Sequence, residues 1–192
     1  MTSMTFQRRI VATTIALACC GAAVPLAQKR GSNLFTDPSN RYSIEFPKDW
    51  NWMIVEGASE AISAFYHPKR EAAIVVERFR MKQVLAQGEI TDVFAQIETD
   101  VLKENQPRAS EVDARIVTQG PKRLVQIDYK RPGIGEPGKS EDQRVRQFSF
   151  PIGGNLYRIT CFANASQFTR YESTCQWAAE SLKSAEELAG KK

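Results

Sequence analysis

The stretch with the strongest resemblance to a chemical motif is GIGEPGKS, residues 133–140, which matches the phosphate-binding loop pattern G-x-x-x-x-G-K-S. In nucleotide-binding proteins this loop follows a buried parallel strand and opens a helix whose N-terminal amides face the phosphates. Here the preceding residues 124–129 (LVQIDY) alternate apolar and polar side chains, and the residues that follow Ser140 indicate a returning strand. We therefore interpret the match as a coincidence in a polar loop between antiparallel strands, and we expect no nucleotide to bind.

Other patterns for catalysis or metal binding are sparse. The single histidine, His67, precedes Pro68 and suits a surface turn. One histidine cannot form a histidine-based metal site, or a Ser–His or Cys–His pair, without distant partners. The carboxylates Glu98, Asp100 and Glu104 have the spacing of the solvated face of a helix. We therefore predict no catalytic residue, no cofactor and no bound metal.

The cysteines form two groups, and the second group predicts a disulfide. Cys19 and Cys20 lie in the N-terminal segment, whereas Cys161 and Cys175 lie near the end of an expected strand and on the inward face of the expected final helix. In an oxidising compartment such a pair can bridge sheet and helix. The chain-entropy model gives this bridge about 3 kcal/mol of stabilisation. The alternative is two reduced thiols that pack as small hydrophobic side chains.

The N-terminal segment has the layout of a secretory signal peptide. Two arginines precede an apolar run over residues 10–18, and small residues follow. The run is shorter than the roughly 20 apolar residues that a membrane-spanning helix needs. We expect residues 1–27 to be the signal peptide, with cleavage after Ala23 or Ala27. The protein is then expected outside the cytoplasm, in the periplasm or cell envelope.

The same segment contains a partial match to the lipobox of bacterial lipoproteins. In the run Leu17-Ala-Cys-Cys20, lipidation at Cys20 would place Cys19 where a small residue is usual. Lipidation at Cys19 would place Ala16 where leucine is usual. A lipid on Cys20 or Cys19 would tether the protein to a membrane surface. We expect membrane contact only through such an anchor.

The length and charge of the chain limit the number of domains and the classes of partner. The 192 residues suffice for one domain with its own core and are too few for two. The net charge is +4, and without residues 1–27 the chain carries 24 basic and 22 acidic side chains. The basic residues are scattered among acids, whereas nucleic-acid binders concentrate positive charge. We therefore expect no nucleic-acid partner.

Hydrophobic periodicity predicts eight strands and two helices. The strands are expected at residues 42–46, 50–55, 61–66, 72–81, 112–117, 123–129, 144–150 and 156–163. The first helix is expected from Thr91 to before Pro107, on the spacing of Val93, Phe94, Ile97, Val101 and Leu102. The order of elements predicts an α+β fold, an antiparallel β-sheet with helices packed on it.

The final helix is expected to begin near Ser166, a favourable N-cap residue. It would place five side chains on one inward face: Phe168, Tyr171, Cys175, Ala178 and Leu182. Trp50 and Trp52 share one side of their expected strand. They would anchor the sheet if buried, or mark a binding surface if exposed.

Both ends of the domain resemble PsbP-like domains. Residues 35–50 (FTDPSNRYSIEFPKDW) resemble the opening strand, proline turn and tryptophan of that family. Residues 154–163 (GNLYRITCFA), with Phe168 and a helix ending at Leu182, resemble its last strand and helix. The resemblance covers about residues 35 to 185 and implies an α/β/α sandwich.

The resulting domain organisation places a linker at residues 28–34, a PsbP-like α+β domain at residues 35–186 and a polar tail at residues 187–192. The family includes an extrinsic photosystem II subunit, bacterial envelope proteins and a nuclear-import factor that binds a small GTPase. The resemblance therefore implies an accessory or interaction role. The histidines linked to metals in PsbP have no counterpart here, since His67 stands alone.

We accordingly expect an exported, non-catalytic domain that binds an unidentified protein or complex of the bacterial cell envelope. The alternative is a module that binds a small apolar ligand between sheet and helix. A pocket lined by apolar side chains would favour the ligand, and a filled core beside an exposed patch would favour the protein partner.

Overall fold

The structure, a computed structural model, describes residues 34–55, 61–82, 84–86, 89–120, 122–133 and 141–190. The predicted signal peptide lies outside these residues, together with Cys19, Cys20 and most of the GIGEPGKS loop. No helix in the described ranges is long and apolar enough to cross a membrane.

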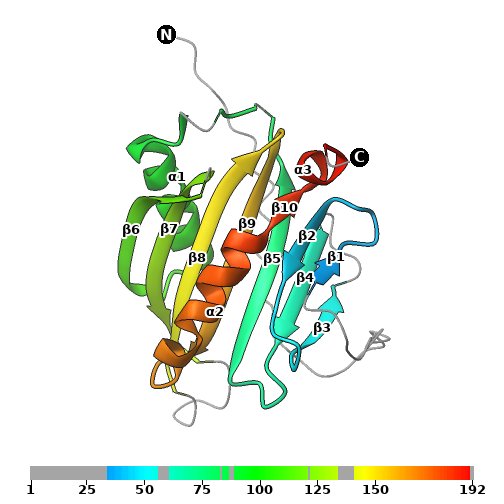
Figure 1. The fold of residues 1–192 in the computed structure, drawn as a ribbon. Helices are drawn as coiled ribbons and strands as arrows, with labels where there is room; N and C mark the ends of the chain where they lie inside the picture. Colours follow the sequence, from blue (N-terminus) through cyan, green and yellow to red (C-terminus); the bar gives the residue numbers. More distant parts are fainter. Residues whose placement is uncertain are drawn as a thin grey trace.

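The main feature of the fold is a seven-stranded sheet in which each pair of neighbours runs antiparallel (Figure 1). In spatial order its strands are β3 (Asn51–Ile54), β4 (Ala61–Tyr66), β5 (Ala72–Arg80), β9 (Asn155–Asn164), β8 (Gln143–Ile152), β7 (Lys122–Arg131) and β6 (Ser110–Gln119). All seven coincide with strands expected from the sequence. The long central ladder is β5-β9-β8-β7, whose strands have nine or ten residues each.

A second, three-stranded sheet was only partly foreseen. Its order is β1 (Leu34–Thr36), β2 (Tyr42–Glu45) and β10 (Lys183–Ser184), and a short helix, α3 (Ala185–Ala189), follows β10. Only β2 was predicted, because strands of three and two residues are too short to show an alternating pattern. Ser184 and Glu187 form a capping box that begins α3.

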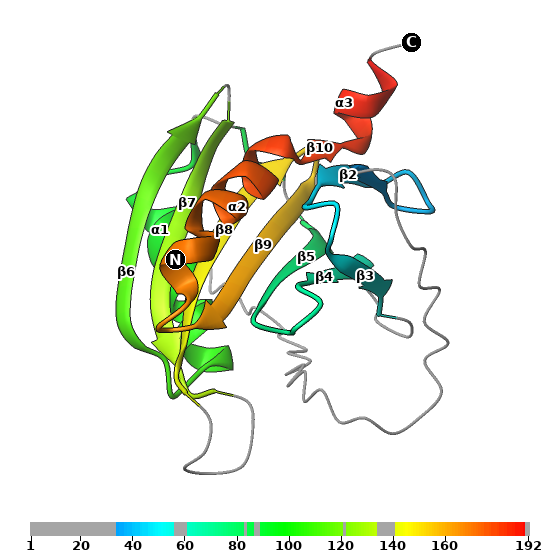
Figure 2. The same cartoon turned by 60° about the horizontal axis from the view of Figure 1, so that its bottom comes forward.

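Two helices cover opposite faces of the large sheet. α1 (Asp92–Asn105) packs over β6 and β7, whereas α2 (Phe168–Ser181) packs on the other face against β8, β9 and β5, and also against β2 (Figures 1 and 2). The predicted α+β fold, with an antiparallel sheet between helices, is confirmed.

The predicted inward face of α2 is correct. Its five residues are buried and join the core cluster of the sheet, which includes Phe148, Phe150, Tyr157 and Ile159. The predicted N-cap is wrong: α2 begins at Phe168 with Gln167 as its N-cap residue. Ser166 lies before the helix, where its backbone N–H (2.6 Å) and hydroxyl (2.9 Å) both donate to Glu141.

Trp50 and Trp52 belong to the core, as expected if they anchor the sheet. Trp50 is 7% exposed, and the partly buried Trp52 packs against the same cluster. The ring of Trp52 meets Phe35 of β1 edge-on at 4.9 Å between centroids. Trp52 therefore links β1 of the small sheet to the large sheet, and Trp50 packs in the core against His67 and Tyr171.

The orientation of α1 corrects part of the sequence analysis. Val93 and Ile97 are 69% and 52% exposed, although their spacing helped to predict the helix. Glu98, expected on the solvated face, is only 3% exposed. The buried side of α1 consists of Phe94, Glu98, Thr99 and Leu102.

Glu98 is buried because it meets an arginine of the sheet. The Nη2 atom of Arg158, on β9, donates to both carboxylate oxygens of Glu98 at 3.3 and 3.0 Å. The Arg158 guanidinium also lies over the Phe79 ring at 5.0 Å. Burial alone would lower the pKa of Arg158, but the charges of Glu98 and Glu77 outweigh it and raise the pKa. This pair fixes α1 on the sheet.

We expect Glu98→Gln to lower the free energy of unfolding by about 3 kcal/mol, because it deprives a buried arginine of its nearest countercharge. Chemical denaturation with a circular dichroism readout would measure the change. Asp100→Asn, an exposed change on the same helix, is the matched control and should cost far less. Equal losses in the two variants would show that the pair does not stabilise the fold.

Cys161 and Cys175 are neighbours in the core between β9 and α2. Both are fully or almost fully buried, and the structure carries them as thiols. Burial, and then the adjacent Cys175, raises the pKa of the Cys161 thiol. The predicted disulfide between them stays a prediction for the exported protein.

We expect protein purified after export to contain the Cys161–Cys175 disulfide, and reduction to lower its free energy of unfolding by up to about 3 kcal/mol. Alkylation of the unfolded protein with and without reductant, followed by mass spectrometry, measures the bond. Cys175→Ser is the control, since its stability should not respond to reductant. Alkylation of both cysteines without reductant would contradict the prediction.

Candidate functional site

The face of the sheet that carries α2 is only half covered. α2 packs on β8, β9 and β5, while β6 and β7 on that side have no helix over them (Figures 1 and 2). Side chains alternate along a strand, so every second residue of β6, β7 and β8 points to the face of the sheet that carries α2. A hollow of about 340 Å³ lies there. We call it the polar trough, and it is lined by four acidic and four basic side chains: Glu111, Asp113, Asp128, Glu172, Arg115, Lys130, Arg144 and Arg146.

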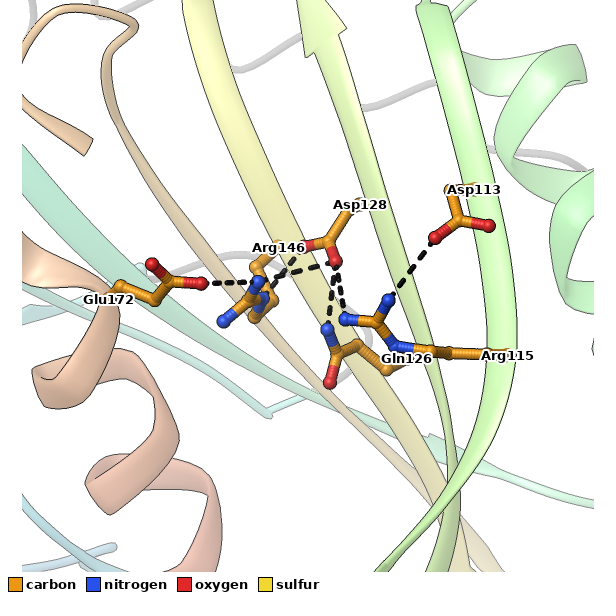
Figure 3. A network of polar contacts seen from close by, with 6 residues as sticks. All are labelled: Asp113, Arg115, Gln126, Asp128, Arg146 and Glu172. Carbon is orange, nitrogen blue, oxygen red and sulfur yellow. Dashed lines mark hydrogen bonds and ion pairs between the residues drawn. The ribbon is translucent and has the colours of Figure 1, made fainter. Parts of the chain in front are cut away.

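Asp128, on β7, is the centre of the trough (Figure 3). Its Oδ1 atom accepts a 2.6 Å hydrogen bond from Nε of Arg146 on β8. Its Oδ2 atom accepts from Nη2 of Arg115 on β6 at 3.1 Å and from Nε2 of Gln126 at 2.8 Å. Asp128 therefore connects all three strands, because register places its neighbours opposite or diagonal to it.

Arg146 connects this network to the helix. Its Nη2 atom lies 2.7 Å from Oε1 of Glu172 on α2, and its guanidinium lies 5.8 Å from the centroid of the Phe168 ring. The residue is 7% exposed. Burial alone would lower the pKa of Arg146, but its hydrogen bonds and charge interactions with Asp128 and Glu172 raise the pKa. Arg146 thus stays charged and has a fixed orientation.

The rim of the trough differs from its centre. Lys130 pairs with Glu111 at 2.6 Å, beside a bulge where Glu111 adopts a left-handed φ of 52°. Arg144 is exposed and lies over the Phe168 ring at 5.5 Å. In the described ranges no carboxylate forms an ion pair with Arg144. Its guanidinium therefore keeps donors available to a partner.

The geometry favours recognition over catalysis. A general base needs a free lone pair near the proton that it removes, whereas the Asp128 oxygens already accept four hydrogen bonds. No group of three or more His, Cys, Asp or Glu side chains that could hold a metal occurs in the described part of the chain. What the trough offers is a set of fixed charges of both signs, arranged for electrostatic complementarity.

His67 lies away from the trough, in the turn between β4 and β5, where a turn was expected. Its ring is half-buried and packs against Trp50 (6.1 Å) and Tyr171 (5.6 Å). The hydroxyl of Tyr171 donates to Glu71 at 2.8 Å, which lowers the pKa of that carboxyl. His67 therefore belongs to the contact between the turn and α2.

The flanks of GIGEPGKS have the arrangement expected from the sequence. β7 before the loop and β8 after it are antiparallel neighbours, with Arg131 opposite Gln143. A phosphate-binding loop would need a parallel strand before it and a helix directly after it. Gly133 is described, and residues 134–140 lie outside the described residues.

Sequence analysis did not identify the trough. The alternation of residues 124–129 did indicate a solvated face on β7, and Gln126 and Asp128 are polar positions of that pattern. The pattern within one strand cannot show which residues of β6 and β8 lie opposite, nor which strands a helix leaves open. The signal that was available is a pair of charged residues two positions apart in each of three neighbouring strands: Asp113 and Arg115, Asp128 and Lys130, and Arg144 and Arg146.

Comparison with known proteins shows a match to one protein family. A family model described as PsbP matches residues 30–184. No curated protein matches the chain significantly. Cyanobacterial PsbP (CyanoP) from Synechocystis is similar in structure, with a TM-score of 0.58 and 17% identity over 88% of this chain and 98% of CyanoP.

Two further solved structures share the fold. The Saccharomyces cerevisiae Ran-binding protein Mog1p has a TM-score of 0.54 and 10% identity, and the match covers 81% of this chain and 96% of Mog1p. A protein from Bacteroides thetaiotaomicron has a TM-score of 0.52 and 13% identity, over 80% of this chain and 48% of its own. At these identities the likeness concerns the fold alone.

Substitutions at the centre and at the edge of the Asp128 network are expected to differ in their effect on stability. We expect Asp128→Ala to lower the free energy of unfolding by about 2 kcal/mol, since it leaves the nearly buried Arg146 short of a partner. Glu172→Gln should cost less than about 1 kcal/mol, because the Glu172 side chain is 43% exposed and water replaces it. Urea unfolding of both variants measures the order. The reverse order would show that Arg146 depends on the helix and not on β7.

Proposed function

The chain belongs to the PsbP family, and on that premise we propose that it is an exported, non-catalytic accessory domain that binds a protein of the cell envelope through the polar trough. The trough is the single observation that carries the proposal. It combines a rigid, hydrogen-bonded centre with a rim on which Arg144 lacks a carboxylate partner in the described part of the chain.

The balance of charge in the trough supports a protein partner. Four acidic and four basic side chains alternate over three strands and α2, so a complementary surface must match both signs at fixed positions. Such complementarity gives specificity and association rate more than raw affinity. A nucleic acid would instead favour a uniformly basic surface.

The packing under α2 also favours a protein partner over a small apolar ligand. That alternative would place a ligand between α2 and the sheet. The described side chains fill this space, since Phe148, Phe150, Tyr157 and Ile159 have no exposed surface there. Because that space is filled, a protein partner is better supported than an apolar ligand.

Export and the envelope location rest on the sequence. The N-terminal segment has the charged, apolar and small-residue regions of a signal peptide. Mog1p, which has this fold, is described as a Ran-binding protein, so the fold is compatible with protein binding. The partner proposed here is a different one, because an exported chain meets envelope proteins.

Photo-cross-linking from the trough tests the proposal. The full chain is expressed in its own cells with a photoreactive residue at Asp113, whose side chain is 66% exposed on the trough rim. We expect one envelope protein to be cross-linked from Asp113, and not from the same residue at Asp100 on α1. Arg144→Glu should abolish the product, because it places a negative charge where a partner carboxylate is expected.

The control is Arg108→Glu, which makes the same change of charge at an exposed position outside the trough. It should leave the cross-linked product unchanged. Equal labelling from Asp113 and Asp100, or a product that survives Arg144→Glu, would contradict the proposed role of the trough.

A further inference from the structure

A second hollow, of about 450 Å³, lies at the end of β5 beside the turn between β8 and β9. Arg78 and Arg80 line it from β5, Gly153 and Gly154 from the turn, and Val84 from the segment after β5. We call it the turn hollow. It shares no residue with the polar trough.

The charge of the turn hollow is one-sided. Arg78 and Arg80 stand two apart on β5, so both point to the same face of the sheet, and no acidic residue is among those that line the hollow. Within the described ranges neither arginine forms an ion pair. The polar trough has the opposite character, because each of its positive charges except Arg144 is neutralised by an acid.

Arg78 is incompletely satisfied. It hydrogen-bonds the hydroxyl of Tyr157, which itself donates to the backbone oxygen of Arg41 at 3.0 Å. The Nε atom of Arg78 is buried and has no hydrogen-bond partner. The buried Nε is out of reach of a ligand, but two neighbouring arginines with no acid among the residues that line the hollow form a site that an anion would stabilise.

The turn allows close approach of another group. Gly153 and Gly154 have φ values of 55° and 77°, a left-handed conformation that glycine adopts without strain. A Cβ on Gly153 would lie 2.4 Å from Oε1 of Glu186, so the carboxylate of this α3 residue rests directly on the bare turn. One anionic group of the chain therefore already reaches the rim of the hollow.

We propose that the turn hollow is a binding site for a phosphate group, held by the guanidinium groups of Arg78 and Arg80. Planar guanidinium donors match phosphate oxygens in pairs, and the volume accommodates a phosphate with part of the molecule that bears it. Glu186, a negative charge at the rim, weakens the site and sets its affinity. The phosphate belongs either to a free solute or to a phospholipid headgroup. This site is independent of the trough and of the proposed protein partner.

Titration calorimetry with inorganic phosphate, and co-sedimentation with vesicles of phosphatidylglycerol or phosphatidylcholine, test the proposal on protein purified after expression of the full chain. Arg80→Gln should weaken binding about tenfold, the effect of removing one charged hydrogen-bond donor. This variant is expected to fold, since Arg80 is exposed. Glu186→Gln should strengthen binding, because it removes the repulsive charge.

Arg108→Gln is the matched control, since it removes one exposed positive charge away from the hollow. Phosphate binding that Arg80→Gln weakens and Arg108→Gln does not supports a free phosphate compound as the source. Vesicle binding with the same dependence, without binding of inorganic phosphate, supports a lipid headgroup. Absence of both kinds of binding overturns the proposal, as do equal effects of Arg80→Gln and Arg108→Gln.

Discussion

The structure depends on the mismatch between one wide sheet and two narrow helices. Seven strands spaced about 4.8 Å apart span roughly 29 Å, whereas a helix with its side chains is about 10 Å wide. One helix therefore covers about two or three strands. α1 covers β6 and β7 on one face, and α2 covers β8, β9 and β5 on the other (Figure 2). The offset leaves β6 and β7 open beside α2, and most of their side chains there are charged or polar.

The limited width of the helices explains why charged residues are buried where a helix stops covering the sheet. Arg146 has the Phe168 ring of α2 on one side and Asp128 of β7 on the other. On the opposite face, Arg158 lies over Phe79 and pairs with Glu98 of α1. In both places an arginine supplies apolar contact through its flat face and charge through its edge. Each arginine connects a helix to a strand that the helix does not cover: Arg146 connects α2 to β7, and Arg158 connects α1 to β9.

The sequence predicted most of the helices and strands, but it did not predict which side chains meet across them. The alternation of β7 correctly placed Gln126 and Asp128 on one polar face, although Gln126 is buried there at 5% exposure, and the resemblance of the domain ends correctly implied the sandwich. The spacing of Glu98 was misinterpreted, because periodicity within one helix cannot show which polar residue meets a buried countercharge on the sheet. Ser166 was misassigned as an N-cap, and its backbone N–H and hydroxyl instead donate to Glu141, 25 residues away in sequence. The predictions failed wherever a partner distant in sequence decides the outcome.

The two surfaces that we assign to binding differ in their balance of charge. In the trough, Asp128 and Glu172 neutralise Arg146, so the site carries little net field and selects partners by the positions of its charges. In the turn hollow, Arg78 and Arg80 have no acid among the lining residues, so the site attracts any small anion that fits. The trough suits a large, patterned surface, and the hollow suits a compact charge. Neither surface needs α1 or α2 to move, because both lie where the helices leave the sheet uncovered.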